Sequence, residues 1–530
     1  MDPSPPPPKR VLLLTNSEHG QANVFLATSY ALLTLPDADV EVHFASFPPI
    51  QPAVSSTSAH ARRDRPSARP IVFHALDGND MVTAWSRPEI LAEQAALYTP
   101  SAVPLVHAVR RGLLLLKVML PWSGDEFVRL MKAVVKVVEE VGPDVVAVDP
   151  AFAPGLTALR GLGCRFVVLA PNTIKDFAMP LQPRGEALWK YPCIGTPYPF
   201  PPPPPLLPQN TLFTLLSLLL SILLDPTRRA LTRYLSTHFP TARLTTLSDL
   251  SLNPHFAGTD RATKFLVANL PEIEFPLSYL PKHIVPCGPM LRPARAVGEM
   301  DCELAGWLEQ AEAGVVYINL GTHVFYGEGL AGEVARAVRV LLDRVAGKGV
   351  RVLWKIPRGP GKDGGVFGEG SVVERVLGGE LREGTVRVVE WLEAEPAAVL
   401  AVGTVVCAVH HGGANSFLES VAAGVPQVIL PLWMDTFDFA RRAELLGIGR
   451  WGNRVAGTLC ERGELGSVLI DLIAGERSSG YRQKARELAE LCKKGGGGRV
   501  IAARHILAEI TVGSVEGGKE TERLLGPASI

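Results

Sequence analysis

Short apolar runs alternate with amphipathic helical patterns along most of this chain. In the first half, the apolar runs cover residues 11–15, 39–45, 71–76, 144–149 and 165–169. In the second half, further runs begin at Val315, Val350, Thr385, Val405 and Gln427. Strands that alternate with helices along a chain form parallel, doubly wound sheets. The pattern therefore predicts an α/β protein with one such sheet in each half.

Interruptions of the pattern divide the chain into domains. We predict a disordered lead (1–10), an N-terminal Rossmann-like domain (11–290), a linker (291–300), a C-terminal Rossmann-like domain (301–480) and closing helices with a tail (481–530). A chain of 530 residues is too long for a single core. A proline tract near 197–208 is expected to be an exposed, extended connector. The apolar segment 212–224 is too short to span a bilayer, so we expect a buried helix, with shallow membrane contact as the alternative.

Composition narrows the class of protein. The 53 basic and 53 acidic residues balance, which gives no sign of nucleic-acid binding or of electrostatic recruitment to membranes. The seven cysteines are scattered without a C-x-x-C pair, so neither a disulfide framework nor a zinc site is indicated. Neither a signal peptide nor a closing membrane span is visible. We therefore expect a cytoplasmic protein.

The most informative segment covers residues 410–435 and reads HHGGANSFLESVAAGVPQVILPLWMD. An apolar strand leads into His411, and a helix is predicted to begin at Asn415 and to end at Gly424, while His410 is expected to point into the core. Glycine allows a ligand to approach the backbone, and a helix start that faces out of a parallel sheet binds anions. With Glu419 one turn further along the helix, this start is suited to a diphosphate attached to a ribose.

This segment resembles the donor-binding signature of the UDP-dependent glycosyltransferases of small molecules, in the patterns H-x-G-x-N-S-x-x-E-S, A-G-V-P and P-x-W-x-D. Residues 315–322, VVYINLGT, resemble the strand and phosphate loop of that family. Residues 269–274 and 287–290, NLPEIE and CGPM, resemble the markers that close its N-terminal domain. The resemblance covers both halves of the chain. It implies the GT-B fold, in which two Rossmann-like domains face each other across a cleft.

The resemblance also implies a donor site in the second domain. The expected UDP-sugar-binding residues are Thr322, Trp391, His411, Gly413, Asn415, Ser416, Glu419, Asp435 and Thr436. Trp391 is expected to stack on uracil and Glu419 to hold the ribose, while the loop and helix residues bind the diphosphate. Asp435 and Thr436 are expected to contact sugar hydroxyls. UDP-glucose is the expected donor, but Thr436 replaces the glutamine usual there, so UDP-N-acetylglucosamine or another UDP-sugar stays open.

Transfer of a sugar to a hydroxyl requires a base, because an alcohol is a weak nucleophile near neutral pH. Residues 15–20 read TNSEHG, and His19 occupies the place of the family's catalytic histidine. Asp149 ends a buried strand at the sheet edge where α/β proteins bind ligands. It matches the family's aspartate, which is expected to hold the tautomer of the histidine. The alternatives are a helix-capping role for His19 and a strand-ending role for Asp149.

The resemblance implies inverting transfer of a hexose from a UDP-sugar to a hydroxyl of a lipophilic small molecule, without a required metal or a permanently bound cofactor. Apolar segments of the N-terminal half suggest a hydrophobic acceptor such as a polyketide, terpenoid or sterol. Two alternatives remain at this point. One is a sugar-nucleotide epimerase of the same fold, and the other is a non-catalytic partner protein that binds UDP-sugar.

Overall fold

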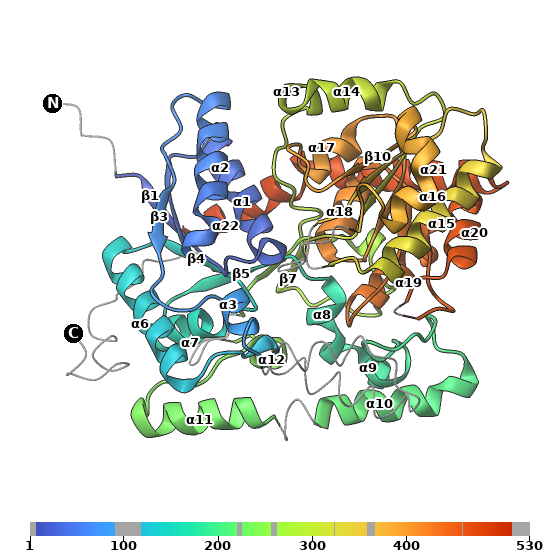
Figure 1. Ribbon diagram of the computed structural model, residues 1–530. Coiled ribbons are helices and arrows are strands. Elements are labelled where there is room, and N and C mark those ends of the chain that lie inside the picture. The colour runs from blue at the N-terminus through green and yellow to red at the C-terminus, as the bar shows by residue number, and fades with distance from the viewer. Residues whose placement is uncertain are drawn as a thin grey trace.

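A computed structural model describes residues 7–88, 90, 118–219, 225–255, 262–322, 324–357, 366–457 and 459–510. The first part of the predicted lead, the end of the apolar segment 212–224 and the tail beyond residue 510 lie outside the described residues. Two domains lie side by side, with the N-terminal half of the chain in blue to green and the C-terminal half in yellow to red (Figure 1).

The first domain is built on a seven-stranded parallel sheet with the order β3-β2-β1-β4-β5-β6-β7. Its strands are β1 (Lys9–Leu14), β2 (Val40–Ser46), β3 (Val72–Ala75), β4 (Val145–Val148), β5 (Phe166–Ala170), β6 (Phe265–Val267) and β7 (Ile284–Pro286). Along β1, Val11 and Leu13 join one hydrophobic cluster and Leu12 and Leu14 join another. Because both faces of the sheet are covered, its central strands are continuously apolar.

The second domain repeats this plan with a six-stranded parallel sheet in the order β10-β9-β8-β11-β12-β13. Its strands are β8 (Val315–Asn319), β9 (Arg351–Lys355), β10 (Val386–Val389), β11 (Val405–His410), β12 (Gln427–Ile429) and β13 (Gly449–Trp451). Val316 and Ile318 face one core, while Val315 and Tyr317 face the other. The predicted architecture of two doubly wound parallel sheets is confirmed.

Helices cover the faces of both sheets (Figure 1). The helices described in the first half are α1 (His19–Thr34), α2 (Gln51–Asp64), α3 (Met81–Trp85), α6 (Gly124–Val141), α7 (Ala153–Gly161), α8 (Ile174–Ala178), α9 (Glu186–Trp189), α10 (Leu207–Leu219), α11 (Pro226–His238) and α12 (Leu247–Leu252). Those of the second half are α13 (Val297–Met300), α14 (Cys302–Glu309), α15 (Glu328–Arg344), α16 (Val372–Glu383), α17 (Pro396–Ala401), α18 (Ala414–Ala423), α19 (Thr436–Leu445), α20 (Arg462–Ala474), α21 (Ser478–Lys493) and α22 (Gly498–Ile510).

The strand order determines where a ligand can bind. In the first sheet the chain reverses its direction of progress between β1 and β4, and in the second sheet between β8 and β11. At such a switch point the loops after the two strands diverge and leave a crevice at the carboxyl edge of the sheet. His19 and Asp149 follow β1 and β4, whereas Thr322 and His411 follow β8 and β11. Both switch points thus carry residues expected at the site.

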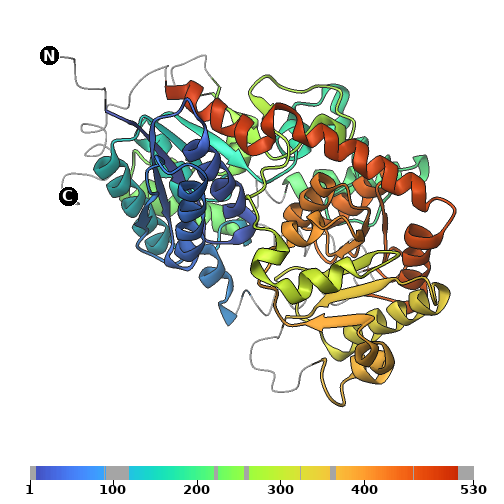
Figure 2. The ribbon, with the colours of Figure 1, turned by 90° about the horizontal axis from the view of Figure 1, so that it is seen from above.

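The C-terminal helices connect the two domains. Figure 2 shows the red helices at the end of the chain running across both of them. Ala502 and Ile506 of α22 are fully buried in the same hydrophobic cluster as residues of α1. At the start of α22, Arg499 donates a hydrogen bond to the carbonyl of Leu291 at 2.9 Å. The last described helix therefore packs on the first domain, although its sequence follows the second.

One expectation about the first domain was wrong. The apolar stretch that begins at residue 212 was expected to form a buried helix, but α10 buries only Asn210, Phe213 and Thr214. Its leucines at 212, 215, 218 and 219 are between 41% and 49% exposed. The proline tract before it is not extended throughout, because Pro204–Leu206 form a 3₁₀ turn that leads directly into α10.

Candidate active site

The loop between β1 and α1 presents His19 at the start of a helix. Glu18 caps α1, its carboxylate accepting a hydrogen bond from the backbone N–H of Gln21. His19 is partly exposed to solvent, and its side chain interacts with that of Asn23. Partial burial and, to a smaller extent, the positive charge of Arg292 lower the pKa of His19 below its usual value of 6.5. A neutral imidazole near pH 7 is the form that can accept a proton.

Asp149 lies fully buried at the end of β4 and holds this loop in place. Its carboxylate accepts hydrogen bonds from the Thr15 hydroxyl at 3.1 Å, from the backbone and side-chain amides of Asn16 at 3.2 Å, and from the N–H of Ala151 at 2.8 Å. Burial raises the pKa of Asp149 to about 6, against the effect of these hydrogen bonds. The described contacts thus join Asp149 to the loop that carries His19, while the imidazole pairs with Asn23.

The start of α18 forms the opposite wall. Gly413 is its N-cap residue and provides no capping side chain, and Gly424 ends the helix in a left-handed conformation with φ +72°. The His411 ring lies between two glycines that leave room for it. A Cβ on Gly413 would lie 2.5 Å from His411 Nε2, and one on Gly321, after β8, would lie 2.7 Å from His411 Cε1. The loop after β8 and the start of α18 therefore meet at His411.

One hydrogen bond joins the two walls. The side-chain amide of Asn415, in the first turn of α18, donates to the backbone carbonyl of His19 at 3.3 Å. Thr322, which follows Gly321, is exposed. Ser416, three residues after Gly413, is half-buried. The structure thus brings the N-terminal ends of α1 and α18, one from each domain, to a common point.

The aromatic residues of the expected site differ in exposure. Trp391, two residues after β10, is 63% exposed, which leaves ring surface available for stacking. The ammonium of Lys355 lies 3.8 Å from the centroid of this ring. Trp433 packs on His411 with ring centroids 5.0 Å apart. His410 is buried, as expected, with Nε2 2.8 Å from the side-chain oxygen of Gln427.

Two carboxylates of the second domain that are expected at the site have raised pKa values. Burial raises the pKa of Glu419 to about 7, an effect that Arg292 partly offsets. Burial also raises the pKa of Asp435 to about 7, and the carboxylate of Asp176 adds to this. The Asp435 side chain nevertheless reaches solvent. Because each group titrates near neutral pH, small changes in its surroundings alter its charge.

Thr436 takes a different position from the expected one. Its side chain is fully buried, and its hydroxyl accepts hydrogen bonds from the N–H groups of Leu432 and Trp433 and donates to the Trp433 carbonyl. Met434, in the turn between Trp433 and Thr436, has a φ of +27°, a conformation that residues other than glycine rarely adopt. The hydroxyl therefore closes the turn that presents Asp435 and is not directed at a ligand.

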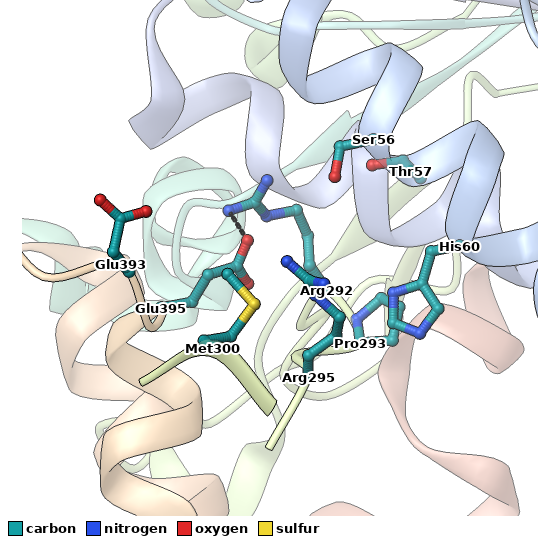
Figure 3. A pocket seen from close by; sticks show the side chains of 9 residues that line it. All are labelled: Ser56, Thr57, His60, Arg292, Pro293, Arg295, Met300, Glu393 and Glu395. Atoms are coloured by element: carbon teal, nitrogen blue, oxygen red, sulfur yellow. Dashed lines mark ion pairs between the residues drawn. The ribbon is translucent and has the colours of Figure 1, made fainter. Parts of the chain in front are cut away.

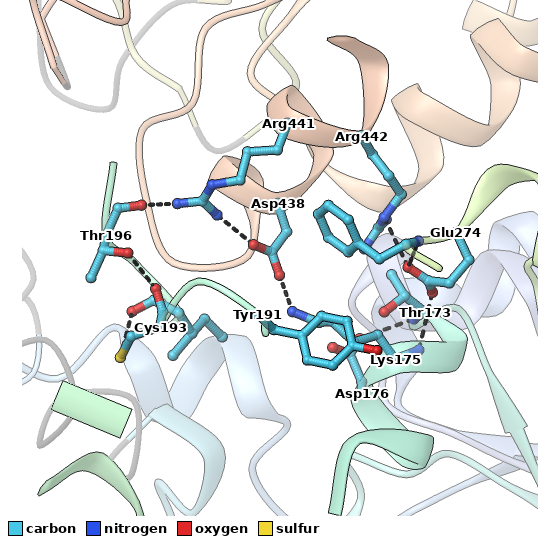
Figure 4. A network of polar contacts seen from close by, with 12 residues as sticks. Thr173, Lys175, Asp176, Tyr191, Cys193, Thr196, Glu274, Asp438, Arg441 and Arg442 are labelled. Atoms are coloured by element: carbon cyan, nitrogen blue, oxygen red, sulfur yellow. Dashed lines mark hydrogen bonds and ion pairs between the residues drawn. The ribbon is translucent and has the colours of Figure 1, made fainter. Parts of the chain in front are cut away.

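A buried ionic network fixes α19, the helix that follows Asp435, against the first domain (Figure 4). Asp438 pairs with Lys175 of α8 and with Arg441 of its own helix. Arg441 also donates to the carbonyls of Thr196 and Tyr198. The next guanidinium, that of Arg442, lies 3.0 Å from a Glu274 oxygen, and both side chains are fully buried. The interface beside the site is thus charged and buried.

A polar pocket lies between the two domains (Figure 3). Its lining comes from α2, from the segment that joins the domains and from the loop after β10, and consists of Ser56, Thr57, His60, Arg292, Pro293, Arg295, Met300, Glu393 and Glu395. Arg292 is paired with Glu395 at 2.6 Å. Since this arginine acts on the pKa values of both His19 and Glu419, it links the two walls electrostatically.

Sequence reasoning missed three sets of these residues. Lys355 ends a strand at the carboxyl edge of the second sheet, which is a position that the strand-end rule could have selected. Asp438 and the two arginines stand out as charges within an apolar helix pattern, FDFARRAEL. No sequence pattern indicates Arg292, because it acts on His19 and Glu419, which are far from it in the chain.

Among the described residues, no group of three or more His, Cys, Asp or Glu side chains is arranged to hold a metal ion. No described helix is both long and apolar enough to cross a membrane.

Comparison with known proteins agrees with the fold and the motifs. The family described as UDP-glucoronosyl and UDP-glucosyl transferase matches residues 243–456. The glycosyltransferase sdnJ of Sordaria araneosa is 32% identical over 508 residues, which cover 92% of this chain and 95% of that protein. The structure of the glycotransferase of kitacinnamycin aligns with a TM-score of 0.59 at 15% identity, covering 95% of this chain and 100% of that one. A UDP-glucosyltransferase from Polygonum tinctorium, solved with 3,4-dichloroaniline, aligns with a TM-score of 0.57 at 18% identity. The alignment covers 95% of this chain and 98% of that one.

Two doubly wound parallel sheets whose switch points meet between the domains form the GT-B fold, and the structural neighbours share it. With a relative similar over nearly its full length and the family match in the donor half, the chain belongs to the UDP-glucoronosyl and UDP-glucosyl transferase family. It is a UDP-glycosyltransferase, an enzyme that transfers a sugar from a UDP-sugar. The resemblance seen in the sequence is confirmed.

Proposed function

We propose that this enzyme transfers a hexose, with UDP-glucose as its donor, to a hydroxyl of a lipophilic small molecule with inversion at the anomeric carbon. The observation that carries this proposal is the hydrogen bond from Asn415 to the His19 carbonyl at 3.3 Å. It joins the backbone of His19 in one domain to the helix start of the other, which supports a site where the His19 imidazole and that helix start act on the same substrate. A base and an anion site that face each other are what a single displacement at a sugar carbon requires.

The donor is proposed to bind along the second domain. Uracil stacks on the open face of Trp391, and Glu419 accepts hydrogen bonds from the ribose hydroxyls. The diphosphate lies at the uncapped start of α18 and against the phosphate loop, where backbone N–H groups favour negative charge. Its contacts are Thr322, His411, Gly413, Asn415 and Ser416. As the bond to the sugar breaks, these groups stabilise the charge that develops on UDP.

The acceptor is proposed to be activated from the first domain. The acceptor oxygen attacks the anomeric carbon and its proton passes to the imidazole of His19, while the bond from that carbon to the β-phosphate oxygen breaks. The new bond forms on the face opposite the leaving group, so the configuration inverts. Asp149 supports His19 through the loop that it anchors at Thr15 and Asn16, and is proposed to stabilise the imidazolium that forms.

Recognition of the sugar is proposed to rest on Asp435, whose exposed carboxylate can accept hydrogen bonds from two hydroxyls. Thr436 holds the turn that presents it. A lipophilic acceptor agrees with the apolar character of the first domain. Large apolar side chains are exposed there at residues 181, 189, 194, 212, 215, 218 and 219. No metal is proposed to take part.

The test is an incubation of the purified protein with UDP-glucose and a panel of lipophilic alcohols and phenols, followed by mass spectrometry. We expect products heavier by one hexose, formed equally well in the presence of EDTA, and a β-linkage by NMR. Products that form only with UDP-N-acetylglucosamine would correct the donor. Conversion of UDP-glucose to another UDP-sugar without an acceptor would refute the proposed transfer. UDP binding without turnover of any donor would do the same.

A further inference from the structure

Lys355 is a nearly buried cation at the edge of the second sheet. Its side chain is 6% exposed, and the contact described for its ammonium is the Trp391 ring, 3.8 Å from the ring centroid. No described carboxylate pairs with it. Burial lowers its pKa, and no charged neighbour contributes to that shift. A charge largely removed from water is costly unless it is paired, and an anion bound at this edge of the sheet would lower that cost.

The position of Lys355 indicates which ligand that is. Lys355 ends β9, which lies between β8 and β10, and its register partners are Asn319 and Val389. Trp391 follows Val389 by two residues and Thr322 follows Asn319 by three. Neighbouring strands are about 4.8 Å apart, a distance that a lysine side chain can bridge. Lys355 is therefore located between the residues proposed to bind uracil and those proposed to bind the diphosphate.

We propose that Lys355 is a donor-recognition residue whose ammonium supplies the positive charge against which the diphosphate of UDP binds. This inference rests on the proposed donor site. The Trp391 ring holds the ammonium in the ligand-free state through a cation–π contact, which is weaker than an ion pair with a phosphate. Arg292, the cation that acts on the pKa of Glu419, is already paired with Glu395. A dianionic diphosphate is thus the natural partner of Lys355.

The experiment compares three ligands that differ only in phosphate. Affinities of uridine, UMP and UDP are measured by calorimetry for the wild-type protein, Lys355→Met and Lys355→Arg. Lys348→Met, an exposed lysine of the same domain, is the matched control. We expect Lys355→Met to weaken UDP on the order of 10- to 100-fold, the range for a hydrogen bond to a charged group. Uridine should change less than about twofold, because its stacking on Trp391 needs no charge. Lys355→Arg should restore most of the UDP affinity.

Thermal unfolding without ligand provides a second readout. Removing an unpaired buried charge should raise Tm in Lys355→Met, whereas loss of a merely structural lysine would lower it. Equal losses for uridine and UDP would overturn the inference, since Lys355 would then act only by holding the Trp391 ring. Unchanged UDP affinity in a variant that still binds uridine would overturn it as well. If the wild-type protein binds neither UDP nor uridine, the proposed donor site itself is wrong.

Discussion

The ion pair between Lys175 and Asp438 is predicted to hold the two domains in register at the active site. The side chains are 4% and 5% exposed, and Asp438 also pairs with Arg441. Asp438→Asn keeps the shape of the side chain but leaves two buried cations without their carboxylate. Removing one partner of a buried pair costs about 3–5 kcal/mol. Lys175→Met should cost less, because Arg441 still neutralises Asp438.

The expected shift in Tm follows from the size of the chain. Unfolding entropy is about 2.1 cal/mol/K per residue, so 530 residues correspond to about 1.1 kcal/mol/K. A loss of about 4 kcal/mol then lowers Tm by about 4 °C. Calorimetry of the Asp438→Asn and Lys175→Met variants and of the double variant measures this directly. Glu487→Gln, which removes an exposed pair with Lys484, is the control and should leave Tm unchanged.

Activity provides the second half of this prediction. Asp438 lies on the helix that begins next to Asp435, so Asp438→Asn should raise KM for the UDP-sugar while the affinity for UDP itself stays nearly constant. Lys175 and Arg441 hold the pKa of Asp438 below its usual value although burial alone would raise it, so its stabilising effect should be lost as pH falls through that lowered pKa. The double variant should lose less stability than the two single losses combined. Strict additivity, or an unchanged Tm in Asp438→Asn, would refute the reasoning.

Three further predictions concern the proposed UDP-sugar-binding residues of the second domain. Gly413→Ala should weaken UDP binding at least tenfold, because its Cβ would displace the His411 ring, whereas Gly327→Ala, at another helix N-cap with open space around it, should not. Uridine affinity should fall as pH drops below about 7, since the pKa of Glu419 lies there and only the carboxylate accepts hydrogen bonds from both ribose hydroxyls. The Glu419→Gln variant should abolish this pH dependence. A dependence that persists in the variant would contradict the role assigned to Glu419. Thr436→Val should slow transfer without altering UDP affinity, because its turn presents Asp435; a variant as active as the wild type would show that the hydroxyl is dispensable.

Much of the fold could be predicted because its signals are local. The inner strands are short and largely apolar. Both ends of β1, β2 and β4 were predicted within two residues, and so was the start of β8. The strands β6, β7 and β13 have only three residues each, too few to show a period, and were missed. The strand β12 is equally short but was predicted, because it lies within the motif segment 410–435. The segment after residue 212 was misread because a continuous apolar run does not reveal which face of a helix is covered.

The site could be predicted only as far as its motifs extend. His411, Gly413 and the start of α18 are encoded within one short segment, whereas Gly321, on the other side of the His411 ring, comes from the loop after β8. The contacts of Asp149 with Thr15 and Asn16 depend on strand pairing, so sequence placed the carboxylate but not its partners. The direction of the Thr436 hydroxyl is decided by a turn with an unusual backbone angle at Met434, which no residue pattern reveals.

The most direct test of the proposed mechanism is the replacement of His19 by alanine. Transfer to an alcohol should fall by a factor of about 10²–10⁴, the usual contribution of a general base, while the affinity for UDP stays within about twofold, because no proposed UDP contact involves the imidazole. Asn23→Ala, which removes the side-chain partner of His19, should retain most of the activity. If His19→Ala transfers sugar at the wild-type rate, His19 is not the base and the proposed mechanism is wrong.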